Sequence, residues 1–547
     1  MKKLPIGIQS IDKILGDKTY AYIDKTSFIK QLIDEGSPHY FIARPRRFGK
    51  SLFLSTLEAL FRGNKKLFKG LAIDKSGYVW KKYPVIRFDF SRVINRTPKE
   101  FEEGLKRAIA KEGVDQGLTI DTPTIQEGLG DLIEKLAETH NAGVVLLVDE
   151  YDKPIIDRLD DVTIAQGNRE ILKDFFTTLK SHDASLKLSF ITGVSKFSQV
   201  SIFSGLNNLN DITMEPKYAG IMGYTEEEIK DSFQSHIHAI AQEWKASEES
   251  IIDELKRWYN GYRFSRGDIC VYNPFSTLNF MSKQETAGYW YATGTPSFLI
   301  EQLKKGHQSM FSLDGATARK DELMDISSLE DIDLKALMYQ TGYFTVQDYN
   351  PISKRYHLGL PNEEVRTAFM NSLVKHFTST VDVRSSEKYV IALEKHQIEV
   401  LFEHIKVGLS SFAYSVFAGA KERTYQAILL SMLYGMGFDP LSERLTNTGR
   451  IDVVLEMPKT TYIMELKLDG SAQAALKQIH EKEYFKPYTH AGKQIVNIGA
   501  NFSSQLRNIS DWTGELLSEE GSLLQTLHPK NSHSGVGSVS GSIGTSL

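Results

Sequence analysis

The sequence predicts a multidomain α/β protein with an N-terminal parallel sheet, a helical middle region and a smaller α/β domain near the C-terminus. Between about residues 20 and 215, short β-branched or aromatic runs alternate with longer helical patterns, as they do in an open α/β sheet. From about 216 to 380 the pattern is mostly helical. From about 385 to 525 a helix is followed by two strands, a helix and a strand.

Length and composition exclude several protein classes. The 547 residues are too many for one hydrophobic core and suit three or four domains. Hydrophobic residues make up 41% and charged residues 24%, which excludes disordered, collagen-like and coiled-coil chains. The 65 Lys and Arg residues nearly balance 69 Asp and Glu, and the net charge is −4. Any site for a polyanion is therefore local.

The expected location is the cytoplasm. Cys270 is the only cysteine, which excludes a disulfide within the chain and fits a reducing compartment. Polar residues soon after Lys2 and Lys3 interrupt any signal-like apolar segment. The strongest apolar run, Ala142–Val148, is much shorter than the roughly 20 residues needed to cross a bilayer. We therefore expect no membrane partner.

Changes of pattern along the chain predict four segments. Residues 1–215 would form the N-terminal α/β domain, and 216–384 a helical lid and linking region. Residues 385–525 would form the second α/β domain, and 526–547, rich in Ser and Gly, a disordered tail. The middle segment opens with a helix-capping box at Thr225–Glu228.

The N-terminal domain is predicted from apolar strand patterns and the amphipathic helices between them. The strands are Tyr40–Ala43, Val85–Phe90, Val144–Val148 and Leu188–Thr192. The helices are Ser51–Phe61, followed by Gly63, and Asn168–Leu179. This alternation is typical of a parallel sheet.

A candidate phosphate-binding loop follows the first strand. Residues 40–54 read as a strand, a tight loop and a helix that begins at Gly49-Lys50-Ser51. Backbone N–H groups at such a helix start point at phosphate oxygens. Lys50 would reach the β and γ phosphates, and the Ser51 hydroxyl would join Mg²⁺. The residues predicted to bind the nucleotide are Arg46, Arg47, Phe48, Gly49, Lys50, Ser51, Leu52 and Asp149.

The loop departs from the usual pattern G-x-x-x-x-G-K-[ST]. Arg44 stands where the first glycine belongs, and Pro45 removes one backbone donor. Arg46 and Arg47 could supply positive charge instead. The alternative is a basic loop before an ordinary helix N-terminus, because Gly-Lys-Ser alone is a weak signal.

Two acids follow the most apolar strand. In a nucleotide-binding α/β fold, Asp149 would hold the water shell of Mg²⁺ and Glu150 would orient the attacking water. The alternative is a core strand followed by a solvated turn. After the next strand, Thr192 or Ser195 could sense the γ-phosphate, and a plain strand end is an equal alternative.

A second candidate site lies on a predicted hairpin. Two β-patterned arms meet near Pro458 and Lys459. Period-two alternation puts Glu465 and Lys467 on one face of the second arm, and a turn at this position puts Asp452 opposite Glu465.

These residue types suit hydrolysis of phosphodiesters. Asp452 and Glu465 could bind one Mg²⁺, and Lys467 would position the water or stabilise the developing charge. The alternative is a solvated hairpin face, although unpaired charges in apolar strands are costly if buried. Glu422 in the preceding helix is a candidate further acid, or simply a solvated helical residue.

The N-terminal motifs resemble those of a known family. Tyr22–Thr26, Arg44–Ser51 and Val148–Asp152 look like segments of the bacterial AAA-ATPase-like family, whose phosphate loop (Walker A) is similarly rich in Arg and Pro. The resemblance implies a P-loop NTPase-type sheet, with Asp149 and Glu150 as the Walker B acids. It further implies that Lys50, Ser51 and Asp149 bind Mg-ATP, and that Glu150 supports hydrolysis.

The C-terminal motifs resemble a nuclease superfamily. Gly449–Asp452, then Glu465–Lys467 and Gln478-Ile479, are similar to the D…E-x-K core of the PD-(D/E)xK nucleases. The resemblance implies a restriction-endonuclease-like α/β domain in which Asp452, Glu465 and Lys467 form the catalytic site.

Two phosphate-handling sites in one chain lead to the main hypothesis, an ATP-controlled, Mg²⁺-dependent nuclease with DNA expected before RNA as its substrate. The alternative is an ATP-dependent switch or scaffold that binds nucleic acid or protein partners without cutting them. A third reading is a structural protein with two decayed domains. Turnover of ATP stays open, and so does assembly into a homo-oligomer, which ATPases of this type often need to complete their sites.

Overall fold

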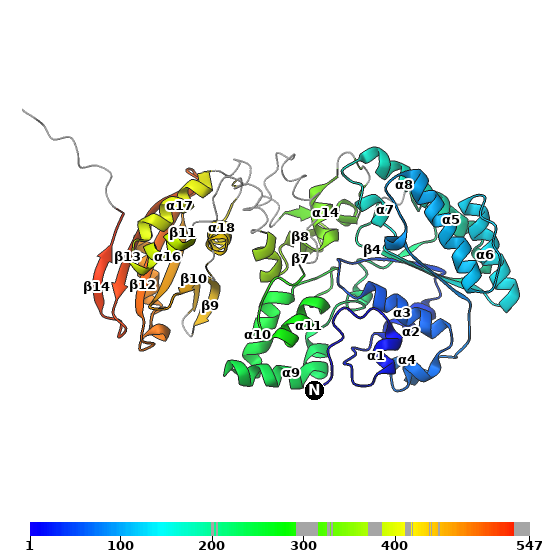
Figure 1. Ribbon diagram of the computed structural model, residues 1–547, viewed down its shortest axis with the longest axis horizontal. Coiled ribbons are helices and arrows are strands. Elements are labelled where there is room, and N and C mark those ends of the chain that lie inside the picture. Colours follow the sequence, from blue (N-terminus) through cyan, green and yellow to red (C-terminus); the bar gives the residue numbers. More distant parts are fainter. Residues whose placement is uncertain are drawn as a thin grey trace, which may run out of the picture. The chain divides into compact units, whose positions relative to one another are not determined.

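The fold comes from a computed structural model, and the chain forms two compact units (Figure 1). The structure describes residues 1–197, 202–203, 206–290, 316–324, 326, 329, 332–369, 386–410, 417, 420–436, 438, 440–446 and 449–529. The first unit takes in the described residues from Met1 to Ala368, and the second begins at Phe369. The described residues between 216 and 368 therefore pack in the same unit as the N-terminal sheet.

The first unit contains a five-stranded, all-parallel sheet in the order β2-β3-β4-β1-β5. Its strands are β1 (His39–Ala43), β2 (Val85–Asp89), β3 (Val144–Asp149), β4 (Leu186–Gly193) and β5 (Asn210–Asp211). The predicted parallel sheet is confirmed, and the two-residue β5 is an addition. β1 and β3 are fully buried, as apolar strands covered on both faces must be.

Helices surround this sheet. In Figure 1, α5, α6 and α8 lie side by side, and they share one apolar core with β2 and β3. The helices of this part are α1 (Ile11–Gly16), α2 (Thr26–Glu35), α3 (Lys50–Phe61), α4 (Ala72–Lys75), α5 (Pro98–Asp115), α6 (Ile125–His140), α7 (Lys153–Ile156) and α8 (Val162–Ser181). α3 starts directly after Gly49, whose φ of 89° lets the backbone turn from loop to helix.

The middle region is mainly helical, as predicted. It contains α9 (Glu226–Trp244), α10 (Glu248–Tyr259), α11 (Pro274–Lys283), α13 (Lys320–Met324) and α14 (Leu334–Thr341). The capping box at Thr225 and Glu228 is present. Three short strands, β6 (Thr317–Ala318), β7 (Thr345–Asn350) and β8 (Arg355–Gly359), form a small antiparallel sheet that the sequence analysis did not predict.

The second unit is built on a six-stranded sheet in the order β14-β13-β12-β11-β10-β9. β11 and β12 are parallel, and the other neighbours are antiparallel. Its elements are α16 (Ser386–Glu394), α17 (Ile398–Ser410), α18 (Glu422–Gly435), β9 (Leu441–Thr446), β10 (Gly449–Glu456), β11 (Thr460–Leu468), α19 (Ala472–Glu481), β12 (Gln494–Ser503), β13 (Asn508–Leu517) and β14 (Leu523–Leu527).

The hairpin of β10 and β11 fixes the relative positions of the candidate acids. Val453 pairs with Met464, and one further step of this register places Asp452 level with Glu465. The predicted order of helix, two strands, helix and strand corresponds to α18, β10, β11, α19 and β12. β9, β13 and β14 extend the sheet, and β14 includes the first two residues of the predicted tail. The rest of that tail, from residue 530 on, lies outside the described residues.

Candidate functional site

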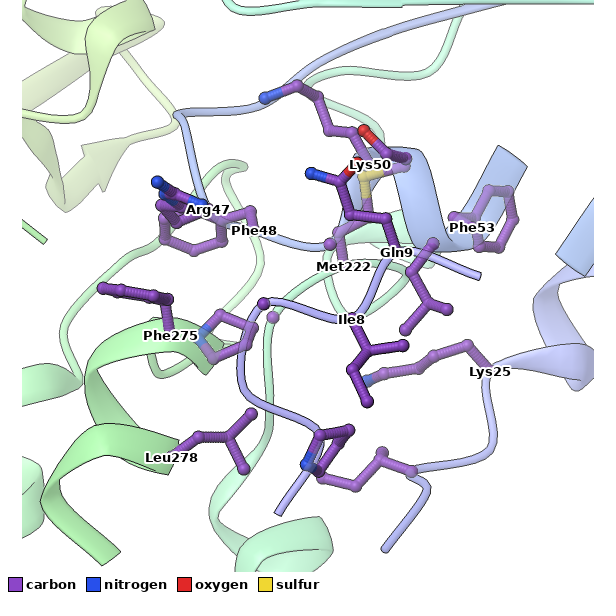
Figure 2. Close-up of a pocket in the computed structure, with 18 of the residues that line it drawn as sticks. Ile8, Gln9, Lys25, Arg47, Phe48, Lys50, Phe53, Met222, Phe275 and Leu278 are labelled. Atoms are coloured by element: carbon purple, nitrogen blue, oxygen red, sulfur yellow. The ribbon is translucent and has the colours of Figure 1, made fainter. Parts of the chain in front are cut away.

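A cavity of about 480 Å³ lies in the first unit, against the start of α3 (Figure 2). One wall is formed by residues 46–53, which run from the loop into α3. Most of the other lining residues lie within 5–9 and 21–25 of the N-terminal segment and within 221–224 and 274–278 of the middle region, and Ser91, Glu150 and Lys153 also line the cavity. Figure 2 shows Ile8, Met222 and Leu278 around the cavity, so part of its lining is apolar.

Lys50 folds back onto its own loop. Its Nζ atom donates to the carbonyl oxygens of Arg44 at 2.9 Å and of Pro45 at 2.8 Å. The side chain is nearly buried, with 7% exposed. Burial lowers the pKa of Lys50. Among the neighbouring charges, the carboxylate of Asp149 opposes this shift most strongly.

Asp149 stands at the carboxyl end of β3. Its Oδ2 atom lies 3.5 Å from Nη2 of Arg87, which also donates to the carbonyl oxygen of Ser51 at 3.4 Å. Its Oδ1 atom is buried and has no hydrogen-bond partner among the described residues. Unpartnered buried oxygens are costly, and a hard cation would satisfy this one.

Glu150 has an unusual backbone. Its φ of 49° is a left-handed value that non-glycine residues rarely adopt, and its side chain lines the cavity. Burial raises the pKa of Glu150, while the ammonium of Lys50 opposes the shift. The strained turn thus presents a half-buried acid to the cavity, beside the start of α3.

Asp152, which follows β3, is hydrogen-bonded to the residues that follow β4. The sequence analysis did not assign this role. Its Oδ2 atom accepts hydrogen bonds from the N–H of Val194, at 2.9 Å, and from both the N–H and the hydroxyl of Ser195. The N–H and the hydroxyl of Ser195 are therefore both used in hydrogen bonds to this carboxylate. The Thr192 hydroxyl is buried as well and donates to the carbonyl oxygen of Ile42 at 3.0 Å.

The predicted basic loop divides into two kinds of residue. Arg46 and Arg47 line the cavity, and the guanidinium of Arg47 lies 4.8 Å from the ring centre of Phe275. Arg44 is fully buried instead. Its guanidinium packs 4.2 Å from the ring centre of Phe264 and donates to the carbonyl oxygen of Thr213 at 2.8 Å.

The second unit brings together Asp452, Glu465 and Lys467. The N–H of Leu466 donates to Oδ2 of Asp452 at 2.8 Å, and Nζ of Lys467 lies 3.5 Å from Oε1 of Glu465. Burial, followed by the charge of Asp452, raises the pKa of Glu465 to about 8. The Oε2 atom of Glu465 is buried without a hydrogen-bond partner among the described residues.

Neighbouring helices hold this hairpin. Gln478 of α19 donates from Nε2 to Oε1 of Glu465. From α18, Glu422 accepts a hydrogen bond from the N–H of Leu468 at 3.0 Å, and Gln426 donates to the carbonyl oxygen of Asp452 at 2.9 Å. Gln426 is a site contact that the sequence analysis did not predict.

Comparisons with known proteins identify both regions. A family model described as "Predicted AAA-ATPase" matches residues 5–203, and one described as "PD-(D/E)XK nuclease superfamily" matches residues 420–512. A protein of Azotobacter chroococcum mcd 1, described as "Uncharacterized protein in vnfD 5'region", is 34% identical over 526 residues. The match covers 94% of this chain and 99% of that relative. The chain belongs to the AAA-ATPase-like family.

This AAA-ATPase-like protein carries a PD-(D/E)XK nuclease superfamily domain at its C-terminus. Among solved structures, a chain from the structure of Drosophila ORC bound to GC-rich DNA and Cdc6 matches with a TM-score of 0.24 and 12% identity. That match covers 41% of this chain and 33% of the other, so this chain spans about a third of the length of the matched chain.

In the AAA-ATPase-like protein, two centres, one around Asp149 and one around Glu465, offer oxygen atoms that fit a divalent cation. Each centre has a buried carboxylate oxygen without a partner, and hard cations such as Mg²⁺ prefer such oxygens. Within the described parts of the chain, no three His, Cys, Asp or Glu side chains gather into a metal-holding group. In the same parts, no helix combines the length and apolar character needed to cross a membrane.

Proposed function

We propose that this protein binds Mg-ATP in the cavity of the first unit, and that its second unit is a Mg²⁺-dependent nuclease acting on DNA under control of the bound nucleotide. One shared feature carries the proposal. Asp149 and Glu465 each hold a buried carboxylate oxygen with no partner in the described structure, and each lies beside a lysine or arginine suited to phosphate.

The cavity suits a nucleotide in size and chemistry. The start of α3 offers backbone N–H groups and a positive helix end to phosphates. Arg46, Arg47 and Lys50 add positive charge. The apolar wall that contains Ile8, Met222 and Leu278 fits a base, so phosphate and base have separate places in one cavity.

The residues around the phosphates have distinct proposed roles. Ser51 and Asp149 would hold Mg²⁺, and Lys50 would leave its loop carbonyls to contact the phosphates. Glu150, at the cavity wall, would orient the water that attacks. The chemistry that a bound Mg²⁺ supplies is neutralisation of phosphate charge and activation of a water.

In the second unit Asp452 and Glu465 would hold the cation, and Lys467 would stabilise charge at the scissile phosphate. The contacts to Glu465 from Lys467 and Gln478 keep that carboxylate in place. We further propose that residues 1–215 bind the phosphates, that 216–384 complete the wall for the base and transmit the nucleotide state, and that 385–525 cut. The single cysteine supports the cytoplasm as the working location.

A second candidate function is an ATP-dependent switch that binds DNA or protein partners without cutting. The bonds from Lys50 to Arg44 and Pro45, two residues outside the usual loop pattern, favour it. Lys50 cannot keep these bonds and contact a phosphate at the same time. ATP binding therefore does not by itself imply ATP hydrolysis.

The test is cleavage of labelled circular and linear DNA with Mg²⁺ or Mn²⁺, with and without ATP. Wild type is compared with Asp452→Ala and Lys50→Ala. Two results together would establish both sites. Asp452→Ala should no longer cut DNA, and Lys50→Ala should still cut DNA but no longer respond to ATP. A wild-type protein that binds ATP and never cuts DNA or RNA would overturn the nuclease proposal and leave the switch.

A further inference from the structure

Every residue of the phosphate loop from Arg44 to Phe48 touches the middle region of the first unit. Phe48 packs on the ring of Tyr262, with ring centres 4.8 Å apart. Arg44 and Arg47 pack on Phe264 and Phe275, as described above. Pro45 lies against Gly342, where an added Cβ would come within 2.7 Å of the proline ring. The side chains of Arg44, Pro45, Arg47 and Phe48 therefore form a packing surface against the middle region.

The contact of Arg46 is a hydrogen bond from a buried tryptophan. The indole Nε1 of Trp290 donates to the carbonyl oxygen of Arg46 at 3.0 Å. Only 6% of Trp290 is exposed, and its ring packs on Tyr343. The loop backbone is thus tied to one side chain that lies 244 residues further along the chain.

The backbone of Trp290 is held in turn by Glu364. Its N–H donates to Oε1 of Glu364 at 2.7 Å, and the hydroxyl of Ser276 donates to Oε2 at 2.8 Å. Glu364 is completely buried. Ser276 lies in the first turn of α11, next to Phe275 at the cavity wall. Glu364 therefore links Trp290, which contacts the phosphate loop, to α11, which lines the proposed nucleotide cavity.

Glu364 also lies close to the end of the first unit. Residues 363–369 are helical, and the side chain of Asn362 caps this helix by accepting from the N–H of Val365 at 3.1 Å. The first unit ends at Ala368, and the second begins at the next residue. The segment that carries Glu364 thus leads directly into a covalent connection between the first unit and the second.

We propose that Trp290 and Glu364 are positioning residues that transmit the state of the phosphate loop to residues 363–368, and so to the start of the nuclease unit. This inference rests on the proposed ATP binding. Lys50 must release the carbonyl oxygens of Arg44 and Pro45 to reach a phosphate. The adjoining Arg46 carbonyl then shifts with the loop, and the Trp290 hydrogen bond passes this shift to Glu364.

The experiment is amide hydrogen exchange of the full chain with and without Mg-ATP. Wild type is compared with Trp290→Phe, which removes the indole N–H and keeps an aromatic ring. Trp244→Phe is the matched control, because Trp244 makes the same kind of bond, at 3.0 Å to the carbonyl oxygen of Gln284 in the same unit. A second variant, Glu364→Met, keeps the side-chain length and removes both acceptor oxygens.

In wild type and in Trp244→Phe, we expect Mg-ATP to change exchange both in residues 44–52 and in residues 361–368. In Trp290→Phe and Glu364→Met, the change in residues 44–52 should persist, while that in residues 361–368 falls at least threefold. An unaltered response of residues 361–368 in both variants would overturn the inference and leave ATP binding intact. No response of residues 44–52 in wild type would overturn ATP binding and the inference together.

Discussion

The Nζ atom of Lys50 lies 2.8 Å from the carbonyl oxygen of Pro45, within the loop that it must partly leave to contact a phosphate. In the proposed ATP complex, the lysine would exchange its two internal hydrogen bonds for a phosphate contact. This exchange makes the ATP-dependent gain in stability, rather than the basal stability, the informative quantity for this residue.

Lys50→Met should abolish most of the stabilisation by Mg-ATP, because it removes the ammonium and keeps the aliphatic stem. For wild type, ligand at 100 times its Kd should add about 2.7 kcal/mol to the free energy of unfolding. The measurement is the melting temperature across an ATP titration. The exposed Lys69→Met is the control and should keep the full shift. An undiminished shift in Lys50→Met would contradict ATP binding at this loop.

Glu465→Gln should reduce DNA cleavage by more than about 100-fold, because loss of even an outer-shell partner of a metal site costs about 10–100-fold. The amide keeps the size of the side chain and removes its charge. The measurements are initial cleavage rates and DNA affinity by gel shift, and only the rate should fall. Glu481→Gln, an exposed change on α19, is the control. Equal rates for both variants would remove Glu465 from the catalytic site.

Glu364 should make the first unit less stable as pH rises. Burial raises the pKa of Glu364 from its ordinary value of 4.5 to about 8, so between these values the folded state binds more protons than the unfolded state. Its stabilising contribution is complete below pH 4.5 and is lost as pH rises through about 8. The slope is at most about 1.4 kcal/mol per pH unit.

This dependence is measured by chemical unfolding of the full chain between pH 5.5 and 8.5. Glu364→Gln should lose the pH slope, so the wild type becomes less stable relative to the variant as pH rises. The exposed Glu138→Gln should follow the wild type. Parallel curves for wild type and Glu364→Gln would show that Glu364 ionises normally in the folded protein.

Gly342→Ala should destabilise the first unit and weaken ATP binding. Its φ of 90° is left-handed, and the new Cβ would lie 2.7 Å from the ring of Pro45. Gly77→Ala is the matched control, since its φ is 74° and no atom lies within 4 Å of the new Cβ. Both changes cost about 1–2 kcal/mol for the backbone. Only Gly342→Ala should cost more and reduce the ATP-dependent melting shift.

The elements that were predicted correctly have strong local patterns. Val144–Val148 is apolar throughout because β3 is covered on both faces, and Gly49 marks the start of α3 through its backbone freedom. The hairpin register could be derived from the turn near Pro458, because one shifted residue would turn every side chain to the other face.

The missed features depend on distant residues. β5, with two residues, exists only because it pairs with β1, and no propensity reveals so short a strand. The burial of Arg44 was not predicted. Its burial depends on carbonyl oxygens near residue 213 and on the ring of Phe264, which no local pattern connects to the loop. The contact between Trp290 and Arg46 is of the same kind.

The hydrogen bond from Trp290 to Arg46 also has a consequence during protein synthesis. A ribosome adds about 5–20 residues per second, so the 244 residues between these partners take about 12–50 s to emerge. The N-terminal sheet can form in that time, yet the side chains of Arg44 and Phe48 still lack the rings that later cover them. The nascent chain therefore exposes this basic loop with Phe48 uncovered, and completes the cavity beside α3 only after the middle region has left the exit tunnel.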